Sequence, residues 1–397
     1  MRFSFATLDL VVLLSTWLPL SSALPTLPPL TDYQIQNFRT INKIYQFTVY
    51  PRQEAIIAQV TNDSIPELEP LFSPTVSGRI QEIGNFTNFR HSIEYFFGLA
   101  PRPQGSMYSA IVEAELTQFS SDHPSIAAST VNFKVALDDP SKPGFGAPGT
   151  RTYTYLKQTG FWHFDEYGRV DYYDLYIPAL NEFATILNGA DFNSKLVQLL
   201  ATKQICQGAQ KLCKGKNTQY HPQIGLQIGA VLNALGLSPL LDLPLINQLG
   251  LGSLNLGELT CFAKLSAKSF GTFDKLWADT VTCRIVHLML AEVDPDDHCE
   301  HVGPTGGGKC VEYPYYDRQF KDNTLFGDTR RFRSASYSSL TPLPPAPPKI
   351  FVPSAHQPAP PTTSYISPSE KSSTKSYQPH RLLLPKVLSY INYVLSL

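Results

Sequence analysis

The chain has 397 residues, of which 16% are charged and 12% are aromatic, and its formal net charge is −1. A charge this close to neutral gives no reason to expect nucleic acid or another polyanion as a partner. The apolar and aromatic content supports a buried core and excludes a wholly disordered chain, and the length favours about two domains.

The first residues have the pattern of a secretory signal peptide. Arg2 gives a positive start, residues 10–20 are almost entirely apolar, and Ser21 and Ala23 place small residues at positions −3 and −1 of a cut after Ala23. An uncleaved membrane anchor is the weaker interpretation, because the run is shorter than the ~20 residues that a span needs. We therefore predict that residues 1–23 are removed and that the protein is secreted.

Helical periodicity follows a short proline-rich lead-in. Over residues 32–50 apolar side chains recur every three or four positions, with Thr31 or Asp32 as the N-cap. Prolines break the pattern over residues 61–78. A second helix is predicted over residues 89–97.

The period then changes to two, which is typical of half-buried strands. One face of the first strand is predicted to hold Tyr108, Ala110, Val112, Ala114 and Leu116. Further strands are predicted over residues 127–137, 151–164 and 169–177, with a tight turn over residues 165–168. Helices followed by an antiparallel meander indicate an α+β fold in which helices cover one face of a sheet.

The segment Phe161–Asp174 (FWHFDEYGRVDYYD) resembles the closing hairpin of the NTF2-like superfamily, including its SnoaL-like branch. The resemblance covers about residues 32–185 and implies a cone-shaped sheet with a pocket for a small-molecule ligand. The whole chain also resembles secreted proteins of filamentous fungi that join such a module to a cysteine-containing helical region.

The second predicted domain, residues 186–325, is mainly helical. Helices are expected over residues 187–213 and 274–293, the latter with Trp277 in its apolar stripe. Residues 223–241 contain no charge. They read as a buried hydrophobic helix, with a membrane span and an insertion over residues 222–258 as alternatives.

All six cysteines lie in this region, and a secreted chain favours three disulfides. They are Cys206, Cys213, Cys261, Cys283, Cys299 and Cys310. Seven residues of helix would separate Cys206 and Cys213 by ~10.5 Å, and a disulfide tolerates ~7 Å. We therefore expect these two to pair with Cys261 and Cys283, which leaves Cys299–Cys310. Asn62 and Asn85 begin Asn-x-Ser/Thr triplets and are predicted glycosylation sites.

Residues 334–397 form a tail of different character. Residues 342–379 hold 11 of the 33 prolines, mixed with serine and threonine, which predicts a disordered stalk. The last sixteen residues are apolar. They have the outline of a GPI signal, but Pro385 and Lys386 interrupt it. The alternative is a loosely attached amphipathic end. Membrane attachment through this end is therefore the less favoured interpretation.

Gly303–Lys309 matches the G-x-x-x-x-G-K part of a phosphate-binding loop. Cys310 replaces the Ser or Thr that would hold magnesium, and no strand is predicted before the motif. We therefore expect no bound nucleotide.

A zinc site is a second candidate. Its mixed ligand set would be His287, His298, Cys299, His301 and Cys310. His287 also follows Cys283 by one helical turn, as in a Cys–His dyad. Disulfide formation by the cysteines is the stronger interpretation, so we expect neither a metal ion nor another cofactor.

The resemblance implies Asp, His and Tyr side chains for proton transfer inside the cone. The matching candidates are His163, Tyr172, Asp174 and Tyr176. The face that lines the cone stays open, and a structural hairpin with a solvent-facing Asp174 is the alternative. The resemblance favours a lyase, isomerase or cyclase of fungal secondary metabolism. The alternative is a non-catalytic secreted protein for binding, host interaction or the cell surface.

Overall fold

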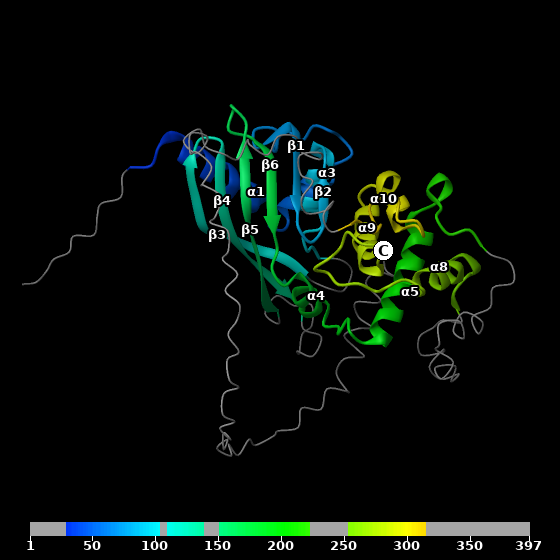
Figure 1. Cartoon of the computed structure of the whole chain (residues 1–397). Helices are drawn as coiled ribbons and strands as arrows, with labels where there is room; N and C mark the ends of the chain where they lie inside the picture. The colour runs from blue at the N-terminus through cyan, green and yellow to red at the C-terminus, as the bar shows by residue number, and fades with distance from the viewer. Residues whose placement is uncertain (1–28, 104–108, 139–150, 223–252, 315–397) are drawn as a thin grey trace, which may run out of the picture.

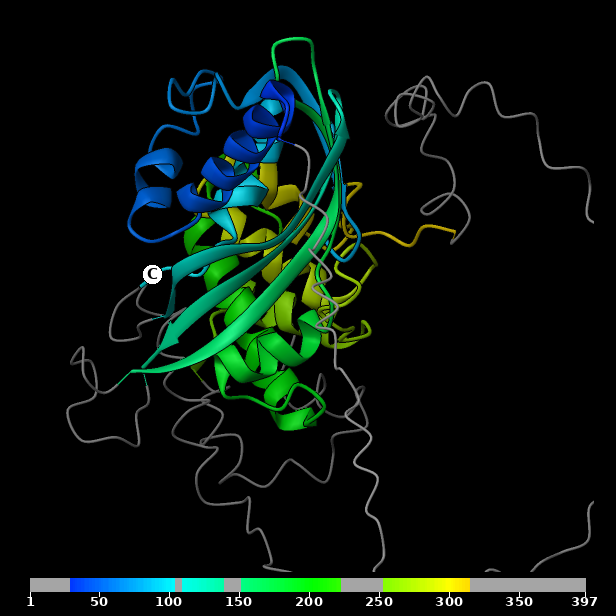
Figure 2. The ribbon, with the colours of Figure 1, turned by 90° about the vertical axis from the view of Figure 1, so that its left-hand side faces the viewer.

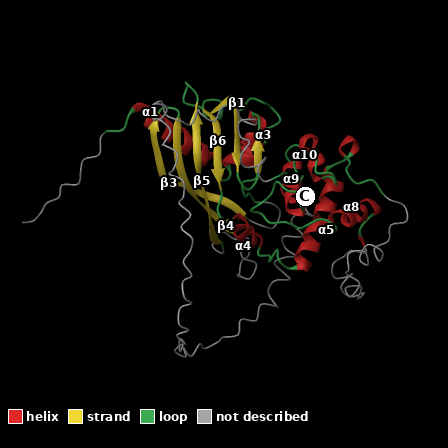
Figure 3. Cartoon of the chain, viewed as in Figure 1, coloured by secondary structure: helices red, strands yellow, loops and turns green. Residues whose placement is uncertain are grey.

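The computed structural model describes residues 29–103, 109–138, 151–222 and 253–314 (Figure 1). The described chain forms a curved sheet with helices on one face, followed by a helical region, as Figure 3 shows by secondary structure. The predicted signal peptide, the uncharged segment 223–241 and the proline-rich tail lie outside the described residues. No helix within these described ranges combines the length and apolarity needed to cross a bilayer.

Four short helical elements precede or interrupt the sheet. They are α1 (Asp32–Phe47), α2 (Arg52–Ile57), α3 (Phe89–Ile93) and the π-helical turn η1 (Glu94–Gly98). The Gln34 side chain accepts a hydrogen bond from the Thr31 backbone N–H at 2.9 Å, which fixes the start of α1. The helices predicted over residues 32–50 and 89–97 are thereby confirmed.

Six strands form one mixed sheet in the order β2-β1-β6-β5-β4-β3. The strands are β1 (Phe72–Ile80), β2 (Gly84–Phe86), β3 (Ser109–His123), β4 (Ile126–Leu137), β5 (Thr152–Phe164) and β6 (Val170–Tyr176). Neighbours are antiparallel except β1 and β6, which run parallel. The four strands of the predicted meander are confirmed, whereas β1 and β2 were not predicted. Pro74 lies where the β1–β6 register is irregular, between Phe72 and Ser77, so the strand tolerates it.

The predicted assignment of side chains to the two faces of β3 is wrong near Val112. The register shifts between Ile111 and Glu113, which is the mark of a β-bulge. Ile111 is consequently buried at 3% exposure and Val112 is exposed at 36%, the reverse of simple alternation. Beyond the bulge, Ala114 faces inward as predicted.

The inner face of the sheet carries a tightly packed aromatic core. Trp162 of β5 pairs in register with Tyr173 of β6, and both are fully buried. Tyr45 from α1 meets the Trp162 ring edge-on at 5.7 Å, and the indole donates to Ser129 Oγ at 2.8 Å. Figure 2 shows the strands bending along their length, with α1 against this inner face.

The helical region contains α4 (Leu180–Asn188), α5 (Lys195–Leu212), η3 (Gly215–Asn217), α8 (Leu256–Ser266), α9 (Val281–Ala291) and α10 (Pro295–Val302). The single helix predicted over residues 187–213 is interrupted, because Gly189 ends α4 with a positive φ of 58°. The helix predicted over residues 274–293 begins only at Val281. Trp277 precedes this helix, and its indole N–H donates to the backbone carbonyl of Gln81, just after β1, at 3.2 Å.

Three disulfides join the helices of this region, and no described cysteine is free. The pairs are Cys206–Cys261, Cys213–Cys299 and Cys283–Cys310, with Cα–Cα distances of 5.5, 5.5 and 5.7 Å. The expected separation of Cys206 from Cys213 is confirmed. Cys206 pairs with Cys261, one of its two expected partners. The expected pairing of Cys213 with Cys261 or Cys283 and the expected Cys299–Cys310 pair are wrong. Helix α10 turns Cys299 toward the end of α5, and the following loop brings Cys310 to the start of α9.

A continuous hydrophobic core runs through both parts of the described chain. It includes Ile41 and Trp162 from the sheet module and Phe262 and Leu290 from the helical region. The sheet therefore does not close its inner face by itself, and helices after residue 176 complete the packing.

Candidate functional site

A cavity lies where the inner face of the sheet meets the later helices. Its volume is about 220 Å³, well above the roughly 10–15 Å³ that one water molecule needs. Strands β1, β3, β4 and β5 supply one wall, and η1 with the residues after it supplies a second. Helices α4 and α9 and the segment before α9 supply further lining residues. The cavity is thus built jointly by the sheet module and the helical region.

The cavity walls are predominantly apolar. The side chains include Ile80, Ile83, Phe96, Leu99, Ile111, Phe133, Leu156, Ile177, Phe183, Leu187, Phe273, Leu276, Ile285, Val286 and Met289. A concave apolar lining of this kind favours an apolar ligand and gives a polar one little compensation for lost water.

Two polar atoms of the lining have no hydrogen-bond partner among the described residues: Gln158 Oε1 and Ser109 Oγ. Gln158 is 5% exposed. Other polar side chains in the lining are satisfied locally; Thr48 and Asn188 each donate to a nearby backbone carbonyl at 2.7 Å. An unpartnered buried acceptor such as Gln158 Oε1 is a site for a donor group of a ligand.

The charged groups of the described lining are Arg102 and Glu292. Arg102 Nη2 lies 3.4 Å from Glu292 Oε2, and both side chains are mostly buried. Glu292 ends α9 and Arg102 follows η1, so the pair joins the helical region to the sheet module. The pair offers a carboxylate and a fixed positive charge to an otherwise apolar cavity.

The sequence-predicted catalytic residues lie elsewhere. In the β5–β6 register His163 pairs with Tyr172, Phe161 with Asp174, and the position before Gly160 with Tyr176. These positions alternate with the buried Trp162 pair, so they face away from the cone, and none of the four candidates lines the cavity. His163, Tyr172, Asp174 and Tyr176 therefore cannot contact a ligand bound in this cavity, and a catalytic role for them elsewhere stays a prediction.

On that outer face, Asp174 and His163 each pair with a charged side chain of opposite type. The Asp174 carboxylate pairs with Arg79 and accepts a hydrogen bond from Gln81 Nε2 at 2.8 Å. His163 Nδ1 lies 2.5 Å from Asp171 Oδ1. The family resemblance made these residues candidates and strand alternation grouped them by face, but alternation alone does not tell which face is inward.

A second polar cluster lies between α9, α10 and η1. It consists of the buried side chains His287, His298, His301, Glu94 and Tyr95, none more than 5% exposed. Burial, with the neighbouring histidines adding to it, lowers the pKa of His287 well below its usual range and that of His301 to about 4. These two imidazoles are therefore neutral at pH 7. The cysteines of the predicted mixed zinc set are not available, because both are in disulfides.

The glycine-rich segment Gly303–Lys309 follows helix α10 and not a strand. Its Lys309 Nζ donates to the Asn85 backbone carbonyl at 3.3 Å. Of the two predicted glycosylation sites, Asn62 is exposed and Asn85 is partly buried in β2. Glycosylation of both stays a prediction.

Comparison with known proteins places similar sequences in fungal biosynthetic gene clusters. A family profile described as the BfoA family C-terminal domain matches residues 258–313. The chain is 27% identical over 258 residues to "Bifonsecin B biosynthesis cluster protein A" of Aspergillus brasiliensis, covering 62% of this chain and 71% of that protein. It is 28% identical to "Aurasperone B biosynthesis cluster protein A" of Aspergillus niger, covering 62% and 70%.

Solved structures with a similar arrangement include a putative SnoaL-like polyketide cyclase from Jannaschia sp. and an NTF2-like superfamily protein from Salmonella enterica. The first is 10% identical, covers 41% of this chain and 99% of that chain, and gives a TM-score of 0.29. The second is 12% identical, covers 37% and 92%, and gives a TM-score of 0.22.

Proposed function

We propose that the protein binds an apolar, ring-containing small molecule in the cavity and acts in the biosynthesis of a secondary metabolite. The observation that carries the proposal is the mainly apolar cavity of about 220 Å³ with the buried, unpartnered Gln158 Oε1 in its wall. The names of the similar Aspergillus proteins support the biosynthetic context.

The ligand's chemistry follows from the lining. Aromatic and branched aliphatic side chains favour flat rings, since Phe96, Phe133 and Phe183 can pack against them. An unpartnered buried acceptor costs roughly 1–3 kcal/mol, and a ligand hydroxyl that donates to it removes that cost. A hydroxylated aromatic compound satisfies both features.

The same proposal extends to a reaction of the lyase, isomerase or cyclase class. Glu292 is the carboxylate in the described lining and is the candidate to accept a proton from the ligand and to return it. Arg102, 3.4 Å away, is the candidate to stabilise the negative charge that develops on the ligand. If the protein only binds and does not catalyse, Glu292 is dispensable for its biosynthetic role.

Binding is tested with 2-naphthol as the probe, by the change in tryptophan fluorescence. Trp162 reports on the cavity because its ring lies 5.9 Å from that of Phe96, a lining residue. The variant Ala184→Phe places a ring in the cavity and should weaken binding at least tenfold. The control Ile186→Phe alters the same helix at a side chain that is 48% exposed, and it should bind as the wild type does. Equal binding by wild type and Ala184→Phe would exclude the cavity as the site.

The reaction is tested by comparing metabolites of a deletion strain with those of its parent. Loss of one product with accumulation of a precursor supports the biosynthetic role. Complementation with Glu292→Gln, which keeps the side chain's size, should fail to restore the product if the carboxylate transfers a proton. Full restoration by Glu292→Gln would leave binding as the function.

We also propose that the chain enters the secretory pathway. The three disulfides support an oxidising compartment. Sequencing of the N-terminus of protein from the culture medium should give Leu24 first. Protein found only in the cytosol, with its first residues intact, would contradict this.

A further inference from the structure

Three buried histidines converge between α9, α10 and η1. His287 comes from α9, and His298 and His301 lie three residues apart on α10. Each offers one ring nitrogen, and the three nitrogens lie within 4.8 Å of one another. The Nδ1 atoms of His287 and His298 are 3.3 Å apart. Imidazoles are thus turned toward a common point in the interior, where each is at most 4% exposed.

The surroundings fix which nitrogen of His298 is free. Its Nε2 lies 2.9 Å from Glu94 Oε2, and the Glu94 carboxylate, itself fully buried, is paired with Arg90 at 2.9 Å. A carboxylate only accepts hydrogen bonds, so Nε2 carries a proton, and Nδ1 is the nitrogen that faces His287. A histidine that donates its other N–H to a carboxylate is the usual arrangement of a metal ligand.

His301 is the third histidine of the cluster. Its Nδ1 is buried beside the Gly307 backbone and lies 3.8 Å from Glu300 Oε1. The His301 ring lies 4.7 Å from the His287 ring, centroid to centroid. His301 therefore adds a third buried imidazole to the cluster, with one ring nitrogen within 4.8 Å of the ligand nitrogens of His287 and His298.

We propose that His287, His298 and His301 bind one divalent transition-metal ion of the zinc class. With metal–nitrogen bonds of about 2.0–2.1 Å, tetrahedral coordination places two ligand nitrogens about 3.3–3.4 Å apart, and the His287–His298 separation of 3.3 Å fits. The Tyr95 hydroxyl lies 3.3 Å from each ring nitrogen of His287 and is the candidate for the fourth ligand. The ion would join α9, α10 and η1, and thereby the helical region to the sheet module.

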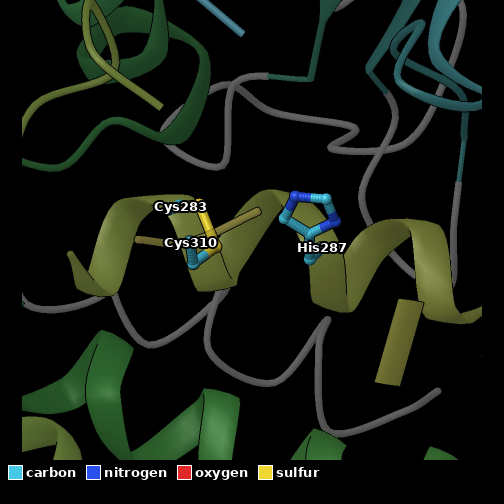
Figure 4. A group of neighbouring side chains, drawn as sticks. All are labelled: Cys283, His287 and Cys310. Atoms are coloured by element: carbon cyan, nitrogen blue, oxygen red, sulfur yellow. A yellow bond between two sulfur atoms is a disulfide. The ribbon is translucent and has the colours of Figure 1, made fainter. Parts of the chain in front are cut away.

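The charges around the cluster are of both signs. Glu94 and Asp297 lie 2.9 and 3.8 Å from His298 Nε2 and supply negative charge at the cluster. Arg90 neutralises part of the Glu94 charge, and Lys309 and Arg284 are the cations that act on His287. The alternative ligand group of Cys283, His287 and Cys310, shown in Figure 4, is excluded because its sulfur atoms form a disulfide and present no thiolate.

The test uses the full chain, secreted by a host grown with added ZnCl2 and purified without a metal-affinity column. Elemental analysis should give one zinc ion per chain, and growth with CoCl2 should give the visible absorption of tetrahedral cobalt. His301→Gln and His287→Gln should each reduce the metal content to about a tenth or less. His91→Gln is the matched control, because His91 pairs with Asp297 beside the cluster and offers no ligand to it. Its metal content should match the wild type.

Metal-free wild-type protein that also takes up no cobalt would overturn the proposal, as would wild-type metal content in His301→Gln. In that case the His287–His298 contact is a shared-proton hydrogen bond. If the histidine variants do not fold, the wild type still decides, since a bound ion must raise its thermal midpoint with added ZnCl2 and lower it with a chelator. The naphthol titration is a separate measurement, so neither result depends on the other.

Discussion

Gln158 connects the chemistry of the cavity to the stability of the fold. Its side-chain carbonyl is buried without a partner, so Gln158→Met removes a polar atom that costs free energy when the cavity is empty. We expect the variant to be more stable by about 1 kcal/mol in thermal unfolding. We also expect wild type to prefer 2-naphthol over naphthalene by roughly two- to tenfold, and Gln158→Met to lose this preference. The exposed control Gln118→Met should show neither change. If Gln158→Met still prefers 2-naphthol over naphthalene, Gln158 does not contact the ligand.

Tyr45 predicts how the fold responds to alkaline pH. Burial raises the pKa of its hydroxyl well above 10, so the native ring stays neutral while the unfolded chain ionises. The stabilisation is complete below pH 10 and falls as pH rises above it, by up to about 1.4 kcal/mol per unit for this one group. Tyr45→Phe should show a shallower loss of stability between pH 10 and 11.5 in urea titrations. The exposed Tyr167→Phe should follow the wild type, and an identical slope for Tyr45→Phe would contradict the account.

The catalytic candidates show what residue patterns can and cannot tell. Alternation correctly grouped Tyr172, Asp174 and Tyr176 on one face of β6 and His163 on the adjoining strand. Both faces of this hairpin carry aromatic side chains, so composition does not mark the inward one. The packing of Tyr45 on Trp162 decides it, and that contact joins residues more than a hundred positions apart.

At the scale of elements, Gly78 allows β1 and β6 to lie side by side with a tyrosine between the sheet and its helices. Gly78 pairs with Tyr173, whose ring atoms would be 2.4 Å from a Cβ at position 78. Gly78→Ala should therefore destabilise the protein by about 1–3 kcal/mol in urea unfolding, because the buried ring has to move. Ser77→Ala, next along the strand, should cost less. Equal small losses in both variants would show that the ring relocates freely.

The predicted helices and strands match the structure where one hydrophobic period continues over many residues, and they differ from it where the element is interrupted. The 3.6-residue pattern of α1 and the two-residue pattern of β4 both correspond to single unbroken elements. The failures coincide with local irregularities: Pro74 in β1, the bulge after Ile111 in β3, and Gly189 between α4 and α5. Each is a local change in backbone conformation that tertiary packing stabilises and that the periodicity of the sequence does not predict.

At the scale of the molecule, the sheet module and the helical region share one hydrophobic core. The hydrophobic core and the cavity both draw residues from each part, for example Phe133 and Val286. We therefore predict one calorimetric transition for the described body, with equal calorimetric and van't Hoff enthalpies. Two resolved transitions would show that residues 32–185 and 186–325 fold separately, as the sequence-based division into domains supposed.

The site was less predictable than the fold because it lies between the two parts. The resemblance of Phe161–Asp174 to an NTF2-like hairpin indicated a cone and a small-molecule pocket, but the walls from α4 and α9 come from outside the resembling segment. Glu292 and Arg102 are 190 positions apart in the sequence and carry no motif. The sequence places His287, His298 and His301 in one candidate ligand set with Cys299 and Cys310, and the disulfides exclude the two cysteines from it.

A crystal structure of the full chain with 2-naphthol bound tests the central claim most directly. The account predicts the aromatic rings between β4, α4 and α9, with the hydroxyl oxygen within about 3 Å of Gln158 Oε1. Naphthol bound elsewhere with the cavity empty, or a cavity filled by the protein's own side chains, would contradict it.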